Sequence, residues 1–121
     1  MASSRVRARE LANNMLVARG KNMSTEVIAQ RELEFVTSSD RETVLVELRK
    51  PFKEKDGPWL CHYLIKCKSF SKEFRMAGED SMQALILVLK IIPVELDALS
   101  KKHNGHFTWF EGSDLGFIPY T

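Results

Sequence analysis

Five residues in this sequence could do chemistry or hold an aromatic ligand: Trp59, Cys61, His62, His106 and Trp109. A cysteine nucleophile needs a base within hydrogen-bond reach, and a third group must orient that base. Cys61, His106 and Asp114 supply these three residue types, but no spacing in the sequence brings them together. We therefore assign no catalytic residue and keep the five as a hypothetical ligand-binding or enzymatic cleft.

The spacing of the potential metal ligands does not indicate a metal site. His103 and His106 lie three residues apart, and Cys61 and Cys67 lie six apart in a segment that alternates like a strand. Six residues of strand span about 20 Å, whereas structural zinc sites use closely spaced cysteine pairs. A glycine-rich phosphate loop is also missing from the sequence. The sequence thus predicts no metal and no cofactor.

Charge divides the chain at about residue 22. Residues 1–22 hold five basic side chains and one acidic one, a net of +4, while the other 99 residues hold 13 basic and 15 acidic ones, a net of −2. The basic side chains, which are the candidates for nucleic-acid binding, are Arg5, Arg7, Arg9, Arg19 and Lys21. Because the body is slightly acidic, we favour a protein partner or a homo-oligomer over a nucleic acid.

The leader and the body are expected to be separate units. Residues 1–22 fit a non-native or upstream-start segment ahead of Met23, an organelle-targeting peptide, or a functional basic arm. A short helix over residues 5–17 is compatible with the spacing of its apolar residues. Residues 23–121 are expected to form a single α+β domain.

Cysteine usage and hydropathy bear on the compartment. A disulfide needs Cα atoms about 5.5 Å apart, which Cys61 and Cys67 cannot reach within one strand. The sequence has no secretory apolar segment and no uncharged apolar run of about 18 residues. We expect a cytoplasmic protein with reduced thiols and no membrane contact.

Alternating apolar and polar residues predict four strands between residues 27 and 76. They are expected at about 27–35, 43–49, 59–68 and 70–76, and residues 51–58 are expected to form a charged loop. Short polar turns join neighbouring strands, which is typical of an antiparallel meander.

Three of these strands have notable faces. Arg31 is the one charged residue on the apolar face of the first strand. The second strand is expected to turn Leu45, Glu47 and Arg49 away from the core. Both faces of the third strand are apolar near its start, which indicates a central position in the sheet.

A helix is predicted from Ser81, with Asp80 as its N-cap and Gln83 reaching back to the cap. Its predicted sheet-facing stripe is Leu85, Leu89, Ile92, Leu96 and Leu99. Pro93 is expected to kink the helix or to restart it as a second one. Asn104-Gly105 is expected to end it with a left-handed stop. The expected fold is α+β: a four-stranded antiparallel meander packed by a C-terminal Pro-kinked helix or helix pair.

Two stretches resemble a family of small bacterial proteins that is known only as a domain of unknown function. They are Trp59-Leu60-Cys61-His62-Tyr63 and Gly78-Glu79-Asp80-Ser81-Met82-Gln83-Ala84-Leu85, and the resemblance covers about residues 27–100. It implies no catalytic or binding residues.

Three functional hypotheses remain open. The leading one is a small non-enzymatic protein-interaction module, for example an immunity-type or regulatory partner, anchored by the aromatic C-terminal segment. The second is the ligand-binding or enzymatic cleft around Trp59, Cys61, His62, His106 and Trp109. The third is nucleic-acid binding through the basic leader.

Overall fold

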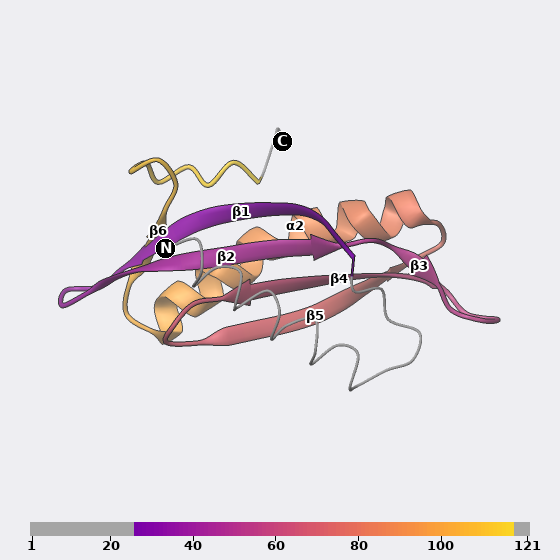
Figure 1. The fold of residues 1–121 in the computed structure, drawn as a ribbon, viewed down its shortest axis with the longest axis horizontal. Helices are drawn as coiled ribbons and strands as arrows, with labels where there is room; N and C mark the ends of the chain where they lie inside the picture. The colour runs from indigo at the N-terminus through magenta and orange to yellow at the C-terminus, as the bar shows by residue number, and fades with distance from the viewer. Residues whose placement is uncertain (1–25, 118–121) are drawn as a thin grey trace.

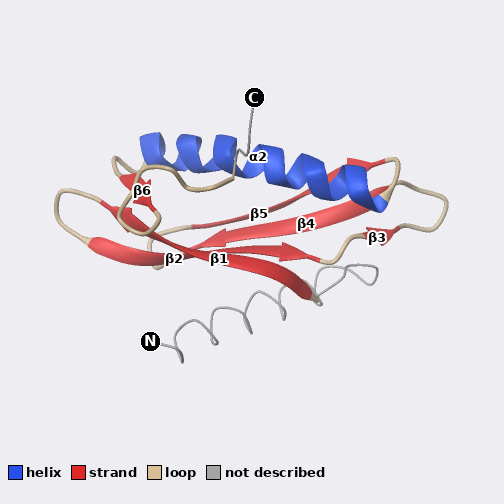
Figure 2. Ribbon diagram, turned by 90° about the horizontal axis from the view of Figure 1, so that it is seen from above, coloured by secondary structure: helices blue, strands red, loops and turns tan. Residues whose placement is uncertain are grey.

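The computed structural model describes residues 26–117. Within this range the fold is α+β, with an antiparallel sheet of six strands and one helix packed against it (Figures 1 and 2). The elements are β1 Val27–Val36, β2 Arg41–Arg49, β3 Phe52–Lys53, β4 Trp59–Lys66, β5 Ser71–Gly78, α2 Ser81–Lys102 and β6 His106–Thr108. No helix among the described residues has the length and apolar character needed to cross a membrane.

The predicted meander is present, but the sheet is larger than four strands. β1, β2, β4 and β5 pair in sequence order, each antiparallel to the next. β6 adds to the outer edge of β1, and β3 pairs with the start of β4. β3 lies inside the segment predicted as a loop, where Phe52 pairs with Leu60 and Lys53 with Trp59. With two residues, β3 is too short for an alternation pattern to reveal it.

α2 is one continuous helix with Pro93 inside it, so the prediction of a helix pair is wrong. Proline removes one backbone N–H and therefore one hydrogen bond, to the carbonyl of Leu89. Ile92 and Leu96, on either side of Pro93, are both fully buried. Tertiary packing of these neighbours on the sheet stabilises the helix across the missing bond.

The start of α2 confirms the predicted N-cap. Asp80 Oδ1 accepts a hydrogen bond from the backbone N–H of Gln83 at 2.7 Å. The Gln83 side chain accepts from the N–H of Glu79 at 2.6 Å, one residue earlier than predicted. At the other end, Asn104 has a φ of 56°, which is the left-handed stop that the sequence predicts.

The helix face against the sheet differs from the predicted stripe. The fully buried residues are Ala84, Val88, Ile92 and Leu96, whereas Leu89 is exposed. A Cβ atom on Gly78 would lie 2.5 Å from the backbone N of Ala84, so the first helical turn packs directly on the end of β5. This close approach fixes the rotation of the helix and turns Ala84 and Val88 inward.

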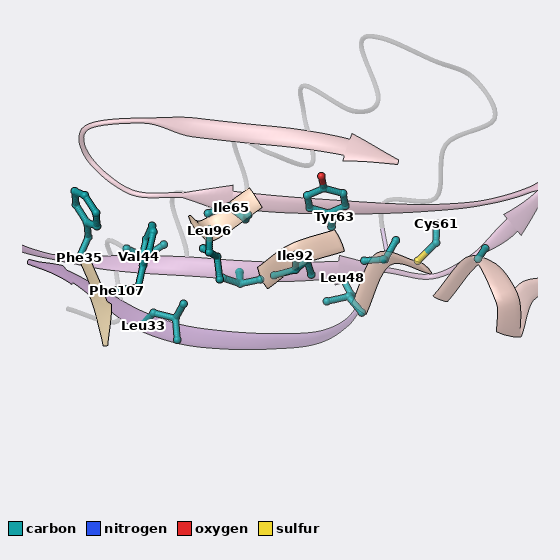
Figure 3. Packing of buried hydrophobic residues seen from close by; sticks show 13 residues of the cluster. Leu33, Phe35, Val44, Leu48, Cys61, Tyr63, Ile65, Ile92, Leu96 and Phe107 are labelled. Atoms are coloured by element: carbon teal, nitrogen blue, oxygen red, sulfur yellow. The ribbon is translucent and has the colours of Figure 1, made fainter. Parts of the chain in front are cut away.

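The core lies between α2 and one face of the sheet (Figure 3). It includes Leu33 and Phe35 of β1, Val44 and Val46 of β2, and Tyr63 of β4. Figure 2 shows α2 along this face, and the helix contacts β4, β5 and β6. The alternation in the sequence therefore predicts the inward side of β1 and β2 correctly.

The residues of β2 that face away from the core are buried, which the sequence does not predict. Leu45, Glu47 and Arg49 point away from the helix as predicted, but all three are buried. Glu47 Oε1 accepts a hydrogen bond from Arg49 Nη2 at 2.8 Å. Because each charge has an ionic partner two residues away on the same face, both side chains tolerate removal from water.

Candidate interaction site

The alternation of β4 separates two of the five candidate residues. Cys61 lies on the helix side of the sheet and belongs to the core cluster. His62 lies on the opposite side, where its ring stacks on Phe52 with centroids 5.7 Å apart. Adjacent residues of a strand point to opposite faces, so Cys61 and His62 do not share a site.

The environment of Cys61 makes its thiol unreactive. Its thiol is fully buried, and its Sγ lies 3.5 Å from the backbone carbonyl oxygen of Arg49. Burial raises the pKa of Cys61 to about 11. Since the thiolate is the nucleophilic form, this thiol is inert near neutral pH.

Of the other three candidates, Trp59 lies two residues from Cys61 on the same face of β4, whereas His106 and Trp109 lie elsewhere in the fold. Trp59 pairs with Lys53 and Gly78 at the β3 end of the sheet, and His106 pairs with Val36 at the β6 end. Figure 2 shows these two ends on opposite sides of the molecule. Trp109 follows β6, so the structure does not bring the five candidate residues together.

Two further predictions concern other residues. Among residues 26–117, no three His, Cys, Asp or Glu side chains gather closely enough to hold a metal ion. The five basic residues of the leader, Arg5, Arg7, Arg9, Arg19 and Lys21, lie outside the described residues.

Arg31, the charged residue on the inward face of β1, makes defined contacts with the C-terminal segment. Its guanidinium carbon lies 4.0 Å from the ring centroid of Trp109 and 4.8 Å from that of Phe117. Its Nη1 donates a hydrogen bond to the backbone carbonyl of Leu115 at 2.9 Å. Residues 109–117 thus cover the part of β1 around Arg31, and Figure 1 shows this segment in yellow beside β1.

Gly116 makes this contact possible. It has a φ of +76°, and a Cβ there would lie 2.5 Å from the Trp109 ring and 3.0 Å from Arg31 Nη1. Only glycine adopts this backbone conformation without a steric penalty while leaving room for both groups.

A tight turn precedes this segment. The N–H of Trp109 donates to the carbonyl of Gly112 at 3.0 Å, and the N–H of Gly112 donates back at 2.9 Å. The two central residues, Phe110 and Glu111, have φ angles of 50° and 65°. Two positive φ angles define a type I′ turn, which normally holds Asn-Gly.

Phe110 is the most exposed large apolar residue of the described chain, at 87%. Its ring centroid lies 5.0 Å from that of Trp109, so one side of the ring borders Trp109. A bulky residue at positive φ is rare, and such strain concentrates at functional sites.

An open groove of about 620 Å³ lies between this turn and β1. It is lined by Gln30, Arg31, Glu32, Leu33, Glu34, Thr43, Thr108, Trp109, Phe110 and Glu111. Three of these residues are acidic and one is basic, and Arg41 donates to Glu34 at 2.6 Å. The groove is therefore bordered by carboxylates and by the exposed Phe110 ring.

Sequence reasoning found Trp109 and the aromatic C-terminal segment that carries Phe110, but it gave Arg31 and Glu111 no role in a site. Two signals were present in the sequence: a charged residue on the apolar face of a strand, and the short run Trp109-Phe110-Glu111-Gly112, which ends in glycine as tight turns often do. Nothing in the sequence indicated the positive φ angle of Phe110, because phenylalanine is not among the residues that type I′ turns favour.

No curated protein and no solved structure matches this chain in comparisons with known proteins. A match to a protein family covers residues 29–119, which confirms the resemblance carried by residues 59–63 and 78–85 and extends it through the groove and the turn. The chain therefore belongs to the family described as a domain of unknown function (DUF6968).

Proposed function

We propose that this protein is a non-enzymatic interaction module that binds another protein through the turn at residues 109–112 and the groove beside it. One observation carries this proposal: Phe110 is 87% exposed and is held at a positive φ angle. A left-handed conformation costs a residue other than glycine about 1–2 kcal/mol. An exposed phenylalanine adds nothing to the core that would offset this cost, whereas an aromatic side chain anchored in a partner does.

A second exposed phenylalanine serves as the comparison. Phe74 is 57% exposed, but it lies within the regular strand β5, where it pairs with Tyr63. Its backbone is not strained, and it lies at the opposite edge of the sheet from β6. Phe74 is thus a matched control for the loss of an exposed aromatic ring.

We also propose that the protein acts in a reducing compartment such as the cytoplasm. Its two cysteines, Cys61 and Cys67, are both free. Oxidising compartments usually convert the cysteines of small domains to disulfides.

The test is co-purification of the tagged full-length chain from its own cells, followed by native mass measurement of the eluted complexes. A partner protein or a second copy should appear with the wild type and with Phe74→Ala. The same complex should decrease at least fivefold with Phe110→Ala, since anchoring aromatic residues contribute more than 1 kcal/mol to binding.

Two results would refute the proposal. One is recovery of the isolated monomer alone from the wild-type cells. The other is a complex that survives Phe110→Ala as well as it survives Phe74→Ala, which would place the interface elsewhere.

A further inference from the structure

The groove beside β1 has a negative charge that repeats along the strand. Glu32 and Glu34 are two residues apart, so both point to the same face at a spacing of about 6.6 Å. Glu111 adds a third carboxylate at the end of the groove, and the ion pair of Glu34 with Arg41 offsets part of the negative charge. Arg31 also lines the groove, but Trp109 and Leu115 hold its guanidinium.

Glu111 is the carboxylate best placed for a partner. Its side chain is exposed, and no cation of the described residues pairs with it. Phe110 is the neighbouring residue in the same turn, and its ring is largely open to solvent. A carboxylate next to an open aromatic face binds a guanidinium or an ammonium group by an ion pair and a cation–π contact.

The same chemistry already operates one residue away. The guanidinium of Arg31 lies over the ring of Trp109 at 4.0 Å, and Trp109 in turn contacts Phe110. The aromatic pair therefore holds one cation on its inner side, and its outer side offers an equivalent surface.

We propose that the groove binds an extended basic segment of the partner, with arginine or lysine at alternate positions. One of these side chains lies over Phe110 and pairs with Glu111, and the others face Glu32 and Glu34. Five consecutive residues of β1 line the groove, and a segment in extended conformation matches their two-residue repeat. This inference rests on the proposed function, for which it names the chemistry of the partner. A nucleic acid is disfavoured because its phosphates would meet three carboxylates.

The experiment uses the full-length chain and a fluorescein-labelled nine-residue peptide in which arginine and serine alternate. Binding is followed by fluorescence anisotropy at 50 mM and 200 mM salt. Glu111→Gln and Phe110→Ala should each weaken the affinity about two- to fivefold, which corresponds to one exposed ion pair or one exposed cation–π contact. The controls Glu79→Gln and Phe74→Ala remove an exposed carboxylate and an exposed ring elsewhere, and should leave the affinity unchanged.

Several outcomes overturn the inference: no binding of the arginine peptide, equal binding of a peptide with glutamate in place of arginine, or equal losses in the control variants. Tighter binding of a nine-nucleotide single-stranded DNA than of the peptide would instead indicate a nucleic-acid surface. If the peptide fails while the complex from cells still depends on Phe110, the interaction module stands and only the chemistry of its partner is wrong.

Discussion

Arg31 illustrates how a strand can carry a charge on its core-facing side. The residue sits in register with Val46 on β2, a fully buried neighbour. Its charge is accommodated because Trp109 and Phe117 cover the guanidinium and the Leu115 carbonyl accepts a hydrogen bond from it. Arginine suits this role, since its planar guanidinium is weakly hydrated and stacks on aromatic rings.

The strain of the turn at residues 109–112 is measurable. Replacing Phe110-Glu111 by Asn-Gly should raise the free energy of unfolding by about 1–2 kcal/mol, because these residues favour the two positive φ angles of a type I′ turn. The same variant should no longer bind the peptide of alternating arginine and serine. Urea denaturation provides the stability measurement, and a stability equal to or below that of the wild type would show that the Phe110 ring contributes to the fold.

Gly116 is a second position where the backbone conformation can be tested by substitution. Gly116→Ala should destabilise the protein by about 1–2 kcal/mol, because the new Cβ meets the Trp109 ring and the φ angle is +76°. In a Trp59→Phe background, tryptophan emission reports on Trp109 alone. Adding Gly116→Ala to this background should shift the emission to longer wavelength, because the Trp109 ring is displaced toward solvent. Gly112→Ala is the control, since its Cβ would meet only the Trp109 carbonyl at an ordinary 3.6 Å.

Among the elements, α2 shows how packing outweighs local preference. Four buried residues at intervals of four hold the helix on the sheet across Pro93: Ala84, Val88, Ile92 and Leu96. The helix also ends in Lys101 and Lys102, whose positive charges interact favourably with the negative end of the helix dipole.

Restoring the hydrogen bond at Pro93 should stabilise this element. Pro93→Ala is expected to raise the free energy of unfolding by about 1–3 kcal/mol, since alanine supplies the missing N–H and is the better helix former. Val94→Ala, at an exposed neighbouring position, should change it by less than about 0.5 kcal/mol. A loss of stability in Pro93→Ala would show that the proline ring packs on its surroundings.

Three weakly acidic side chains, the buried Cys61 and Tyr63 and the half-buried Cys67, link the stability of the protein to alkaline pH. Burial raises the pKa of Cys61 and of Cys67 from 9.0 to about 11. Burial, together with the charge of Glu95, raises the pKa of Tyr63 from 10.0 to about 12. The folded state therefore holds these three protons more tightly than the unfolded state does.

The sign of the pH dependence follows directly. The contribution of these groups to stability is fully present below pH 9 and is lost as the pH rises through 11 and 12. Urea midpoints measured from pH 8 to pH 12 should stay level up to about pH 9 and then fall. A Cys61→Ala, Cys67→Ala double variant should show a shallower decline between pH 9 and pH 11, and an unchanged slope would contradict this origin.

Much of the architecture could be predicted from the sequence, because alternation and capping are local signals. The four-strand meander, the Asp80 cap and the stop at Asn104 were each predicted from neighbouring residues. The rotation of α2 was not, since it depends on the close contact of Gly78 with Ala84. The groove was also missed, because it requires β1 to meet a segment more than 70 positions later in the chain.

The long separation between Arg31 and its cover has a consequence for biosynthesis. The carbonyl that accepts its hydrogen bond belongs to a residue 84 positions later. On a ribosome, the nascent β-hairpin emerges long before the aromatic residues that will shield this cation have been translated. The hairpin can pair early, but the outer edge of β1 stays exposed to solvent and to other chains until residues 109–117 have been synthesised. During this interval the nascent chain is most exposed to misassembly.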